Sequence, residues 1–452
     1  MNAVFRFTSH ISGLTSRIYH FVWSRPILKD TLVTTVLSVI GKGAGFLVPL
    51  FVAAWFGVST ETDAFFFAYG LILFSTGIFA PVVESVIVPF IAQIRVKDET
   101  EVRTFLGTTL VFAIGGLLVL SGFFLVILEP LLLALTRFPQ ESIELIFRLF
   151  LETIPLLVFL VTTSVLSGAL NAYKLFVLPA VSPALRMMVT LLTIWVLKNR
   201  IGVHSIAMGY VTGEVFRLVL LGSEAVKRKM LVFKVTIDLK QNFVEFLRVS
   251  FYQVIGLVAV AFNPMVDKAM ASWLSPGSVS ILEYADRVYQ IPMTFMSSGL
   301  FVVLLSHWSG DFYQEDKAFF RRKVINMAKI VGVGTLLFSF LLILARNPLV
   351  RFVYGYGKFP TEYLNPVATV WSLYLGGLAP TILGLIFARA HLAMKNTTVF
   401  MQLGIANCIL HVLLNLVLIN PFGIYGLAFS TTLTYSIISA GLCLTFLKIR
   451  MI

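Results

Sequence analysis

The stretch ILEYADRVYQIP, residues 281–292, decides how the chain is interpreted, because it places charged side chains inside an otherwise apolar run. These are Glu283, Asp286 and Arg287. A charge at the centre of a bilayer costs about 2.5–3.5 kcal/mol on insertion scales, so such residues usually face a cavity or a partner. Glu283, Arg287 and Gln290 follow one another at a spacing that keeps them on one face of an α-helix. The stretch therefore predicts one wall of a hydrated, charged cavity within a membrane protein.

The composition supports that class of protein. The 452 residues are 58% hydrophobic and only 13% charged, and their mean hydropathy is +0.91. These values are typical of polytopic membrane proteins. The net charge of +13 lies mostly in alternate loops, as the positive-inside rule predicts, so we expect no nucleic-acid partner. Cys408 and Cys443 lie in apolar runs and predict neither a disulfide framework nor a metal site.

Runs of about 20 mostly apolar residues predict about twelve membrane-spanning helices. The first six are expected near residues 31–56, 64–94, 105–128, 142–170, 177–197 and 203–224, and the second six near 243–270, 280–310, 324–345, 363–392, 399–419 and 424–447.

The loops predict the orientation of these helices. Roughly 20 lysines and arginines fall on one side and about six on the other, which predicts that both termini are cytoplasmic. Residues 1–30 have apolar side chains at helical spacing opposite basic ones, as in an amphipathic helix on the cytoplasmic membrane surface. Residues 225–242 form a basic cytoplasmic linker between the halves.

The two halves match one another at a nearly constant offset. Arg103 meets Arg321, Pro130 meets Pro348, and Phe138 meets Phe359. Six spans return the chain to its starting side, so the halves are expected to be parallel repeats. We therefore predict an all-α polytopic membrane protein with an N-lobe (31–224) and a C-lobe (243–452) around a central cavity, which is the architecture of a transporter.

Four further charged residues are candidates for the cavity. Lys42 lies in the middle of the first span and Glu84 lies deep in the second, where only a partner would stabilise either charge. Arg186 has no acid at helical spacing, which also favours the cavity. Asp63 follows Thr62 near the start of the second span and is either a helix N-cap, a functional residue or both.

Other polar residues are expected to have structural roles. Four acid–base pairs at helical spacing can each neutralise themselves along one helix face: Arg148–Glu152, Glu283–Arg287, Glu214–Arg217 and Glu245–Arg248. Of these, Arg148–Glu152 and Glu245–Arg248 lie near the membrane edges and are expected to be structural. Asp267 and Lys268 are expected to form an interfacial pair, and His391 and His411 to be hydrogen-bonded packing residues. Proline and glycine interrupt several spans and predict kinks or hinges, for example Gly41–Pro49 in the first span, Pro155 in the fourth, and Gly376, Gly377 and Pro380 in the tenth.

The chain contains no motif of an enzyme. It has no glycine-rich phosphate loop, no HExxH motif and no cysteine–histidine cluster. The predicted loops are also too short to hold a separate catalytic domain. We therefore expect a protein that is not an enzyme and has no cofactor; coupling to an ion gradient or to the membrane potential stays open.

Three patches resemble the lipid II flippase family, the MviN-type branch of the multidrug/oligosaccharidyl-lipid/polysaccharide exporter superfamily. The first is YADR at 284–287 with Gln290 and Pro292, preceded by ASWLSPGSVS at 271–280. The second is FG at 56–57 followed by TDAFF at 62–66, and the third runs from LNL at 414–416 to PFGIYGLA at 421–428. Together they cover nearly the whole chain in order.

The resemblance implies a flippase of the bacterial inner membrane with two six-helix lobes. Such a protein moves an undecaprenyl-pyrophosphate-linked saccharide from the cytoplasmic to the periplasmic leaflet, and its cations engage the pyrophosphate. Carried over, Arg287 is the best match, with Asp286 beside it and Asp63 in the Thr-Asp-Ala-Phe-Phe motif. Lys42 stands where the family has an arginine.

The sequence also departs from the family pattern. A second arginine of the first helix falls on Val48, and an arginine pair of the second helix falls near residues 75–77 (STG). Lipid II flippases carry two further C-terminal helices, which are not expected here. These departures favour a polysaccharide or exopolysaccharide repeat unit as cargo, with the peptidoglycan precursor a close second.

Two other functions remain open from the sequence. A drug or cation antiporter of the same superfamily would have a cavity dominated by acids, which Lys42 and Arg186 argue against. A non-transporting membrane scaffold would need no buried charge, which the stripe from Glu283 to Gln290 argues against.

Overall fold

The computed structural model describes residues 45–231, 241–297, 317–394 and 398–448. All regular elements within these ranges are helices. The same ranges hold 9 helical segments that are long and apolar enough to cross a membrane. Together with the shorter apolar helix at Leu47–Phe56 and the partly described segments, this confirms the predicted all-α membrane architecture.

The N-lobe is a bundle of long helices. Ser59 begins the second of them through a capping box with Thr62, and Asp98 caps the third by accepting from the Thr100 amide at 2.8 Å. Its elements are α3 (Leu47–Phe56), α4 (Thr60–Lys97), α5 (Glu99–Leu135), α6 (Gln140–Thr153), α7 (Pro155–Ala172), α8 (Val177–Ile201) and α9 (His204–Lys227).

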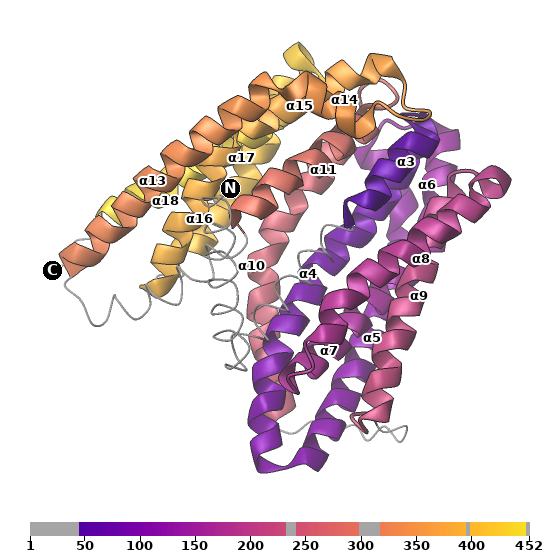
Figure 1. Ribbon diagram of the computed structural model, residues 1–452, viewed down its shortest axis with the longest axis vertical. Coiled ribbons are helices and arrows are strands. Elements are labelled where there is room, and N and C mark those ends of the chain that lie inside the picture. The colour runs from indigo at the N-terminus through magenta and orange to yellow at the C-terminus, as the bar shows by residue number, and fades with distance from the viewer. Residues whose placement is uncertain (1–44, 232–240, 298–316, 395–397, 449–452) are drawn as a thin grey trace, which may run out of the picture.

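The C-lobe repeats this arrangement. Figure 1 shows α13 to α18 as one arm and α3 to α9 as the other, with α10 and α11 between them. The elements of the C-lobe, α10 and α11 included, are α10 (Gln241–Ala271), α11 (Ser278–Ser297), α13 (Lys317–Leu344), α14 (Arg346–Tyr354), the 3-10 turn η1 (Thr361–Tyr363), α15 (Leu364–Gly376), α16 (Leu378–Ala393), α17 (Thr398–Phe422) and α18 (Ile424–Lys448).

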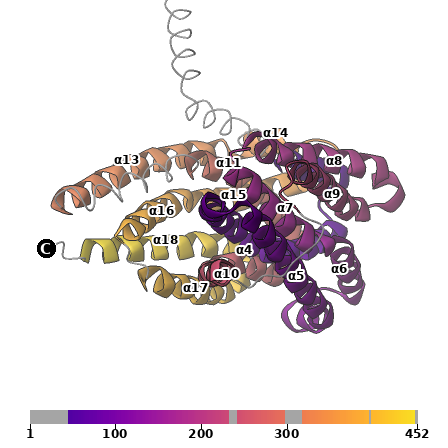
Figure 2. The same ribbon diagram turned by 90° about the horizontal axis from the view of Figure 1, so that it is seen from below.

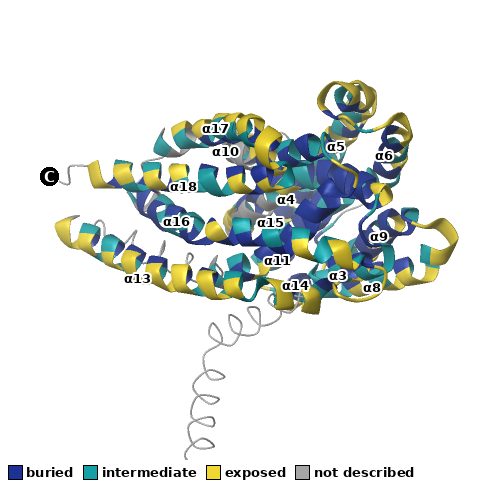
Figure 3. Cartoon of the chain, turned by 90° about the horizontal axis from the view of Figure 1, so that it is seen from above, coloured by how far each residue is buried: buried dark blue, intermediate teal, exposed yellow. Residues whose placement is uncertain are grey.

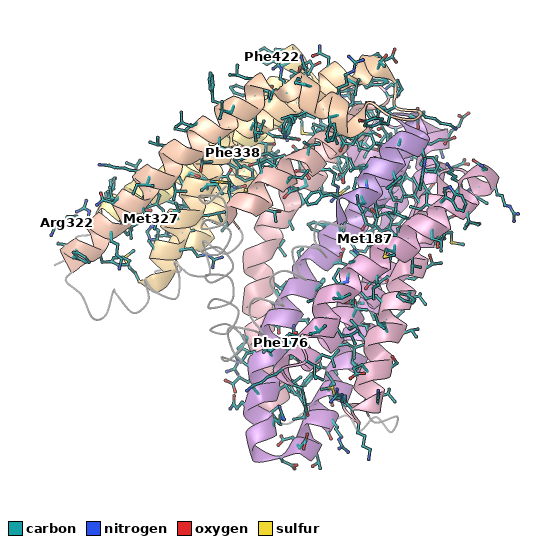
Figure 4. All side chains as sticks on the ribbon, viewed as in Figure 1. Phe176, Met187, Arg322, Met327, Phe338 and Phe422 are labelled. Carbon is teal, nitrogen blue, oxygen red and sulfur yellow. The ribbon has the colours of Figure 1, made fainter. Side chains whose placement is uncertain are left out.

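The two arms converge at one end, where α3, α11 and α14 meet, and diverge toward the other. The view from below agrees, with α13, α16, α17 and α18 spreading to one side of α4 and α10 (Figure 2). Arg322 lies at the far end of α13 and Phe422 at the opposite end of the C-lobe (Figure 4). We call the converging end the closed end.

The fourth span of each lobe is broken where the sequence predicts an interruption. α6 ends at Thr153 and α7 begins at Pro155, since a proline has no amide hydrogen for the preceding turn. In the C-lobe, α15 ends at Gly376 and the Gly377 amide bonds to Tyr374 rather than continuing the helix. The Thr432 hydroxyl donates to the Leu373 carbonyl at 2.6 Å, so the carbonyl at the break is satisfied inside the membrane.

The core lies where the lobes meet and the outer surfaces are apolar. Dark blue residues gather around α4, α11 and α15 in Figure 3, while the outward faces of α5, α13 and α17 are exposed. On α5, Val119 and Val126 are 74% and 76% exposed. Such faces suit a lipid environment, because lipid rather than water would cover them.

Candidate functional site

Helix α11 carries an ion pair and a polar pair into the junction between the lobes. Glu283 and Arg287, one helical turn apart, form a salt bridge through Glu283 Oε1, as the sequence predicts. On the neighbouring face the Gln290 amide donates to Asp286 at 3.0 Å. Glu283 is buried, while Asp286, Arg287 and Gln290 are partly exposed. The stripe therefore lines a polar space at the junction.

Lys268 of α10 completes this ion pair, and sequence analysis missed its role. Its Nζ lies 2.8 Å from Glu283 Oε2 and donates to the Phe66 carbonyl of α4 at 3.1 Å. The expected interfacial pair between Asp267 and Lys268 is wrong, because successive residues of a helix point in different directions. Lys268 instead joins α10, α11 and the N-lobe.

Lys268 fits against α4 because residue 70 is a glycine. A Cβ atom at Gly70 would lie 2.9 Å from Lys268 Nζ and 3.1 Å from its Cδ. The end of the lysine could move away only by leaving Glu283 and Phe66.

Replacing Gly70 with alanine is therefore expected to destabilise the protein by about 1–3 kcal/mol, as overpacking usually does. The melting temperature in detergent would measure the loss. Gly77→Ala on the same helix is the matched control, because a Cβ there meets nothing within 4 Å. Equal melting temperatures for the two variants would contradict the constraint on Lys268.

A cavity of about 330 Å³ opens beside these residues. Its walls come from α4 of the N-lobe and from α10, α11, α15 and α18 of the C-lobe. Arg287 and Lys268 supply its cations, and Glu283, Asp286 and Asp267 its acids. The apolar and aromatic part of the lining is Leu73, Phe74, Ala261, Pro264, Met265, Leu282, Tyr289, Tyr374 and Tyr435.

Asp267 belongs to a buried polar cluster inside the C-lobe. His411 Nε2 lies 2.8 Å from Asp267 Oδ1, and the Asn415 amide donates to the same oxygen at 2.7 Å. Ser430 donates in turn to Asn415. The prediction that His411 is hydrogen-bonded is confirmed, and His391 likewise lies 3.2 Å from the Leu442 carbonyl. Among the described residues, no group of three or more His, Cys, Asp or Glu side chains is placed to bind a metal.

Asp63 does not cap its own helix, which Ser59 does. Its Oδ2 accepts from the Gly277 amide at 2.6 Å, and its Oδ1 accepts from the Ser280 amide at 2.7 Å and from the Ser280 hydroxyl at 2.5 Å. These groups form the start of α11, whose amide ends attract negative charge. The N-cap interpretation is therefore wrong for α4, and Asp63 instead caps a helix of the other lobe.

Further hydrogen bonds join the lobes at the closed end. The Tyr284 hydroxyl donates to the Gly57 carbonyl at 2.8 Å, and the Lys358 amide donates to the Ala54 carbonyl at 2.7 Å. Ala54 lies in the last turn of α3, and Gly57 directly follows that helix. Asp63 and these two contacts hold the closed end together.

The family model for the lipid II flippase MurJ matches residues 52–451. The chain belongs to the MurJ family. Family membership makes it a transporter rather than an enzyme. One relative, the probable lipid II flippase MurJ of Buchnera aphidicola subsp. Acyrthosiphon pisum, is 25% identical over 426 residues, covering 90% of this chain and 81% of the relative. The probable lipid II flippase MurJ of Thermotoga maritima is 25% identical over 418 residues, covering 90% and 83%.

Solved structures share the MurJ fold. A lipid II flippase MurJ in an inward closed conformation aligns with a TM-score of 0.78 at 23% identity, covering 92% of this chain and 87% of that one. An inward-facing multidrug resistance transporter of the MATE family also aligns with a TM-score of 0.78, at 12% identity, covering 93% and 98%. The two-lobe transporter fold predicted from the sequence is confirmed.

Arg186 does not supply a free cation to the cavity of this MurJ-family chain. Its NH1 lies 2.8 Å from Glu214 Oε2, and Arg217 lies 3.4 Å from the other oxygen of the same carboxylate. Thr163 also donates to Glu214 at 2.6 Å. Arg186 has no acid at helical spacing on α8, as the sequence indicates, but the adjacent helix α9 supplies Glu214, and Arg186 is not among the residues that line the cavity. The predicted Glu214–Arg217 pair is confirmed, whereas Glu152 pairs with His204 at 2.8 Å.

Two candidates cannot be placed. Lys42 lies outside the described residues, as does the side chain of Glu84, so both assignments stay predictions. The structure thus brings Arg287, Glu283, Asp286 and Gln290 together at the cavity. It puts Asp63 in the contact between the lobes, at the start of α11.

The positions where the resemblance expects further arginines carry no charge. Val48 is fully buried. The hydroxyls of Ser75 and Thr76 donate to carbonyls of their own helix, those of Leu71 and Ile72, at 3.3 and 2.8 Å. Among the described residues that line the cavity, the cationic side chains are therefore Arg287 and Lys268.

Proposed function

We propose that this chain flips an undecaprenyl-pyrophosphate-linked saccharide from the cytoplasmic to the periplasmic leaflet of the bacterial inner membrane. The observation that carries the proposal is the cavity at the lobe junction with Arg287 and Lys268 on its wall, in a member of the MurJ family. Charge-assisted hydrogen bonds to phosphate oxygens are strong in a low-dielectric site.

Of the two saccharides that the sequence leaves open, family membership favours the peptidoglycan precursor lipid II over a polysaccharide repeat unit. The relatives that match over 90% of the chain are described as probable lipid II flippases. Arg186 no longer argues against a drug or cation antiporter, because it is paired with Glu214. The family match, however, gives the antiporter no support. The non-transporting scaffold gives no reason for the buried charges.

The lobe contacts suggest how alternating access would operate. Asp63, Tyr284 and Lys358 hold the closed end together, so the cavity would receive its headgroup from the diverging end. Rocking of the lobes would break these contacts and expose the cavity at the other side. We propose that the diverging end faces the cytoplasm, with both termini on that side, and that an ion gradient or the membrane potential drives the cycle.

Two measurements test this proposal. Purified protein in liposomes is expected to expose fluorescent lipid II on the opposite leaflet, and the chain is expected to sustain growth when it replaces the flippase in a depletion strain. Lysis of that strain, with the protein shown to be expressed and inserted, would point to another polymer. Absence of flipping of every lipid-linked saccharide offered would refute the function.

A further inference from the structure

Glu283 occupies the place on Arg287 and Lys268 that an anionic ligand would need. Its two carboxylate oxygens are divided between the two cations, with Lys268 at 2.8 Å and Arg287 in close contact. The carboxylate is 5% exposed, so this arrangement is buried at the wall of the cavity. A phosphate group likewise presents oxygens to two donors at once.

The other acids of the cavity do not neutralise these cations by direct contact. Asp286 accepts from Gln290, and Asp267 accepts from His411 and Asn415. Glu283 is therefore the carboxylate within ion-pair distance of both cations among the described residues.

Arg287 has a hydrogen-bond donor that Glu283 does not use. Its Nε is buried and, among the described residues, has no acceptor. A guanidinium binds phosphate best through two parallel N–H donors, and Glu283 contacts only NH2. A phosphate that replaced the carboxylate could accept from both Nε and NH2, which Glu283 does not do in this arrangement.

We propose that Glu283 is a built-in competitor of the substrate's diphosphate: it neutralises Arg287 and Lys268 before binding, is displaced from them by the diphosphate, and returns to them on release. This rests on the proposed function, because it assigns a residue role to the same site. A cavity of about 330 Å³ leaves room for the displaced carboxylate to turn toward water.

The exchange explains how a tightly held anion can leave. Two cations without a counter-charge would be costly in a buried site, so release would otherwise be unfavourable. Glu283 restores neutrality at that moment. Because Lys268 also donates to Phe66 across the lobe junction, its movement toward a diphosphate would remove a contact between α10 and α4.

The test measures binding of inorganic pyrophosphate to the purified full-length protein by calorimetry. Glu283→Gln keeps the shape of the side chain but removes its charge, and it is expected to bind pyrophosphate at least about tenfold more tightly than the unmodified protein. The Asp286→Asn variant removes the same charge from the same cavity without touching Lys268 or Arg287. It is expected to show a clearly smaller gain.

An equal gain in both variants, or no gain in Glu283→Gln, would overturn the assignment. If Glu283→Gln fails to fold, the Lys268→Gln variant is measured instead, and its affinity for pyrophosphate is expected to fall by about tenfold. Unchanged affinity in Lys268→Gln would also overturn the assignment. Flipping is measured separately. If the unmodified protein flips lipid II but Glu283→Gln does not bind pyrophosphate more tightly, only this inference is refuted. If Glu283→Gln binds pyrophosphate more tightly but the unmodified protein flips no lipid-linked saccharide, only the proposed function is refuted.

Discussion

Replacing Arg287 with alanine is expected to reduce flipping at least about 30-fold, because truncating one member of a buried, hydrogen-bonded charge pair costs about 2–5 kcal/mol. Arg287 is paired with Glu283 and lines the cavity. Its removal takes away one of the two described cations on the cavity wall. Initial rates of lipid II exposure in liposomes, at matched protein content, measure the effect.

A control arginine separates this effect from a general loss of charge. Arg346 begins α14 in the same lobe and donates to the Ser372 hydroxyl at 3.0 Å, away from the cavity lining. Arg346→Ala is expected to keep flipping within about twofold. Arg287→Lys should retain part of the activity, since a lysine keeps the charge but loses the planar fork. Full activity in a well-folded Arg287→Ala protein would remove Arg287 from the mechanism.

The fold and the wall of the cavity could be predicted because both depend on local patterns. Apolar runs of membrane length predicted the spans, and Pro155 and Gly377 marked where the fourth span of each lobe breaks. The pairing of Glu283 with Arg287 follows from their spacing on one helix. Such features need no knowledge of how helices pack.

The missed contacts all join different helices. Lys268 finds Glu283 on the next helix, and Arg186 finds Glu214 on α9. Helical spacing within one segment cannot reveal such partners, so Arg186 looked unpaired and Lys268 looked satisfied by its neighbour Asp267. Gly70 makes room for Lys268 on α4, but this role can be recognised only once α4 is known to pack on α10.

Asp63 is expected to control the closed end of the transporter. Its carboxylate accepts from two backbone amides and one hydroxyl at the start of α11, and a hydrogen bond to a charged group contributes about 1.5–3 kcal/mol. Asp63→Ala would leave those amides without an acceptor and weaken the contact between the lobes. A cysteine introduced at Ser278, which is 3% exposed, should then react faster with a membrane-impermeant maleimide, by about tenfold or more.

The measurement requires Cys408 and Cys443 to be replaced first, since both are free thiols. Asp98→Ala is the matched control: Asp98 also caps a helix, accepting from Thr100, but it does so within the N-lobe and at the opposite end of α4. That variant should leave labelling at position 278 unchanged. Asp63→Asn should fall between the two, because an amide oxygen still accepts hydrogen bonds but carries no charge to favour the start of α11. Equal labelling in Asp63→Ala and Asp98→Ala would mean that other contacts between the lobes, among them those of Tyr284, Lys358 and Trp273, suffice to hold the lobes together without Asp63.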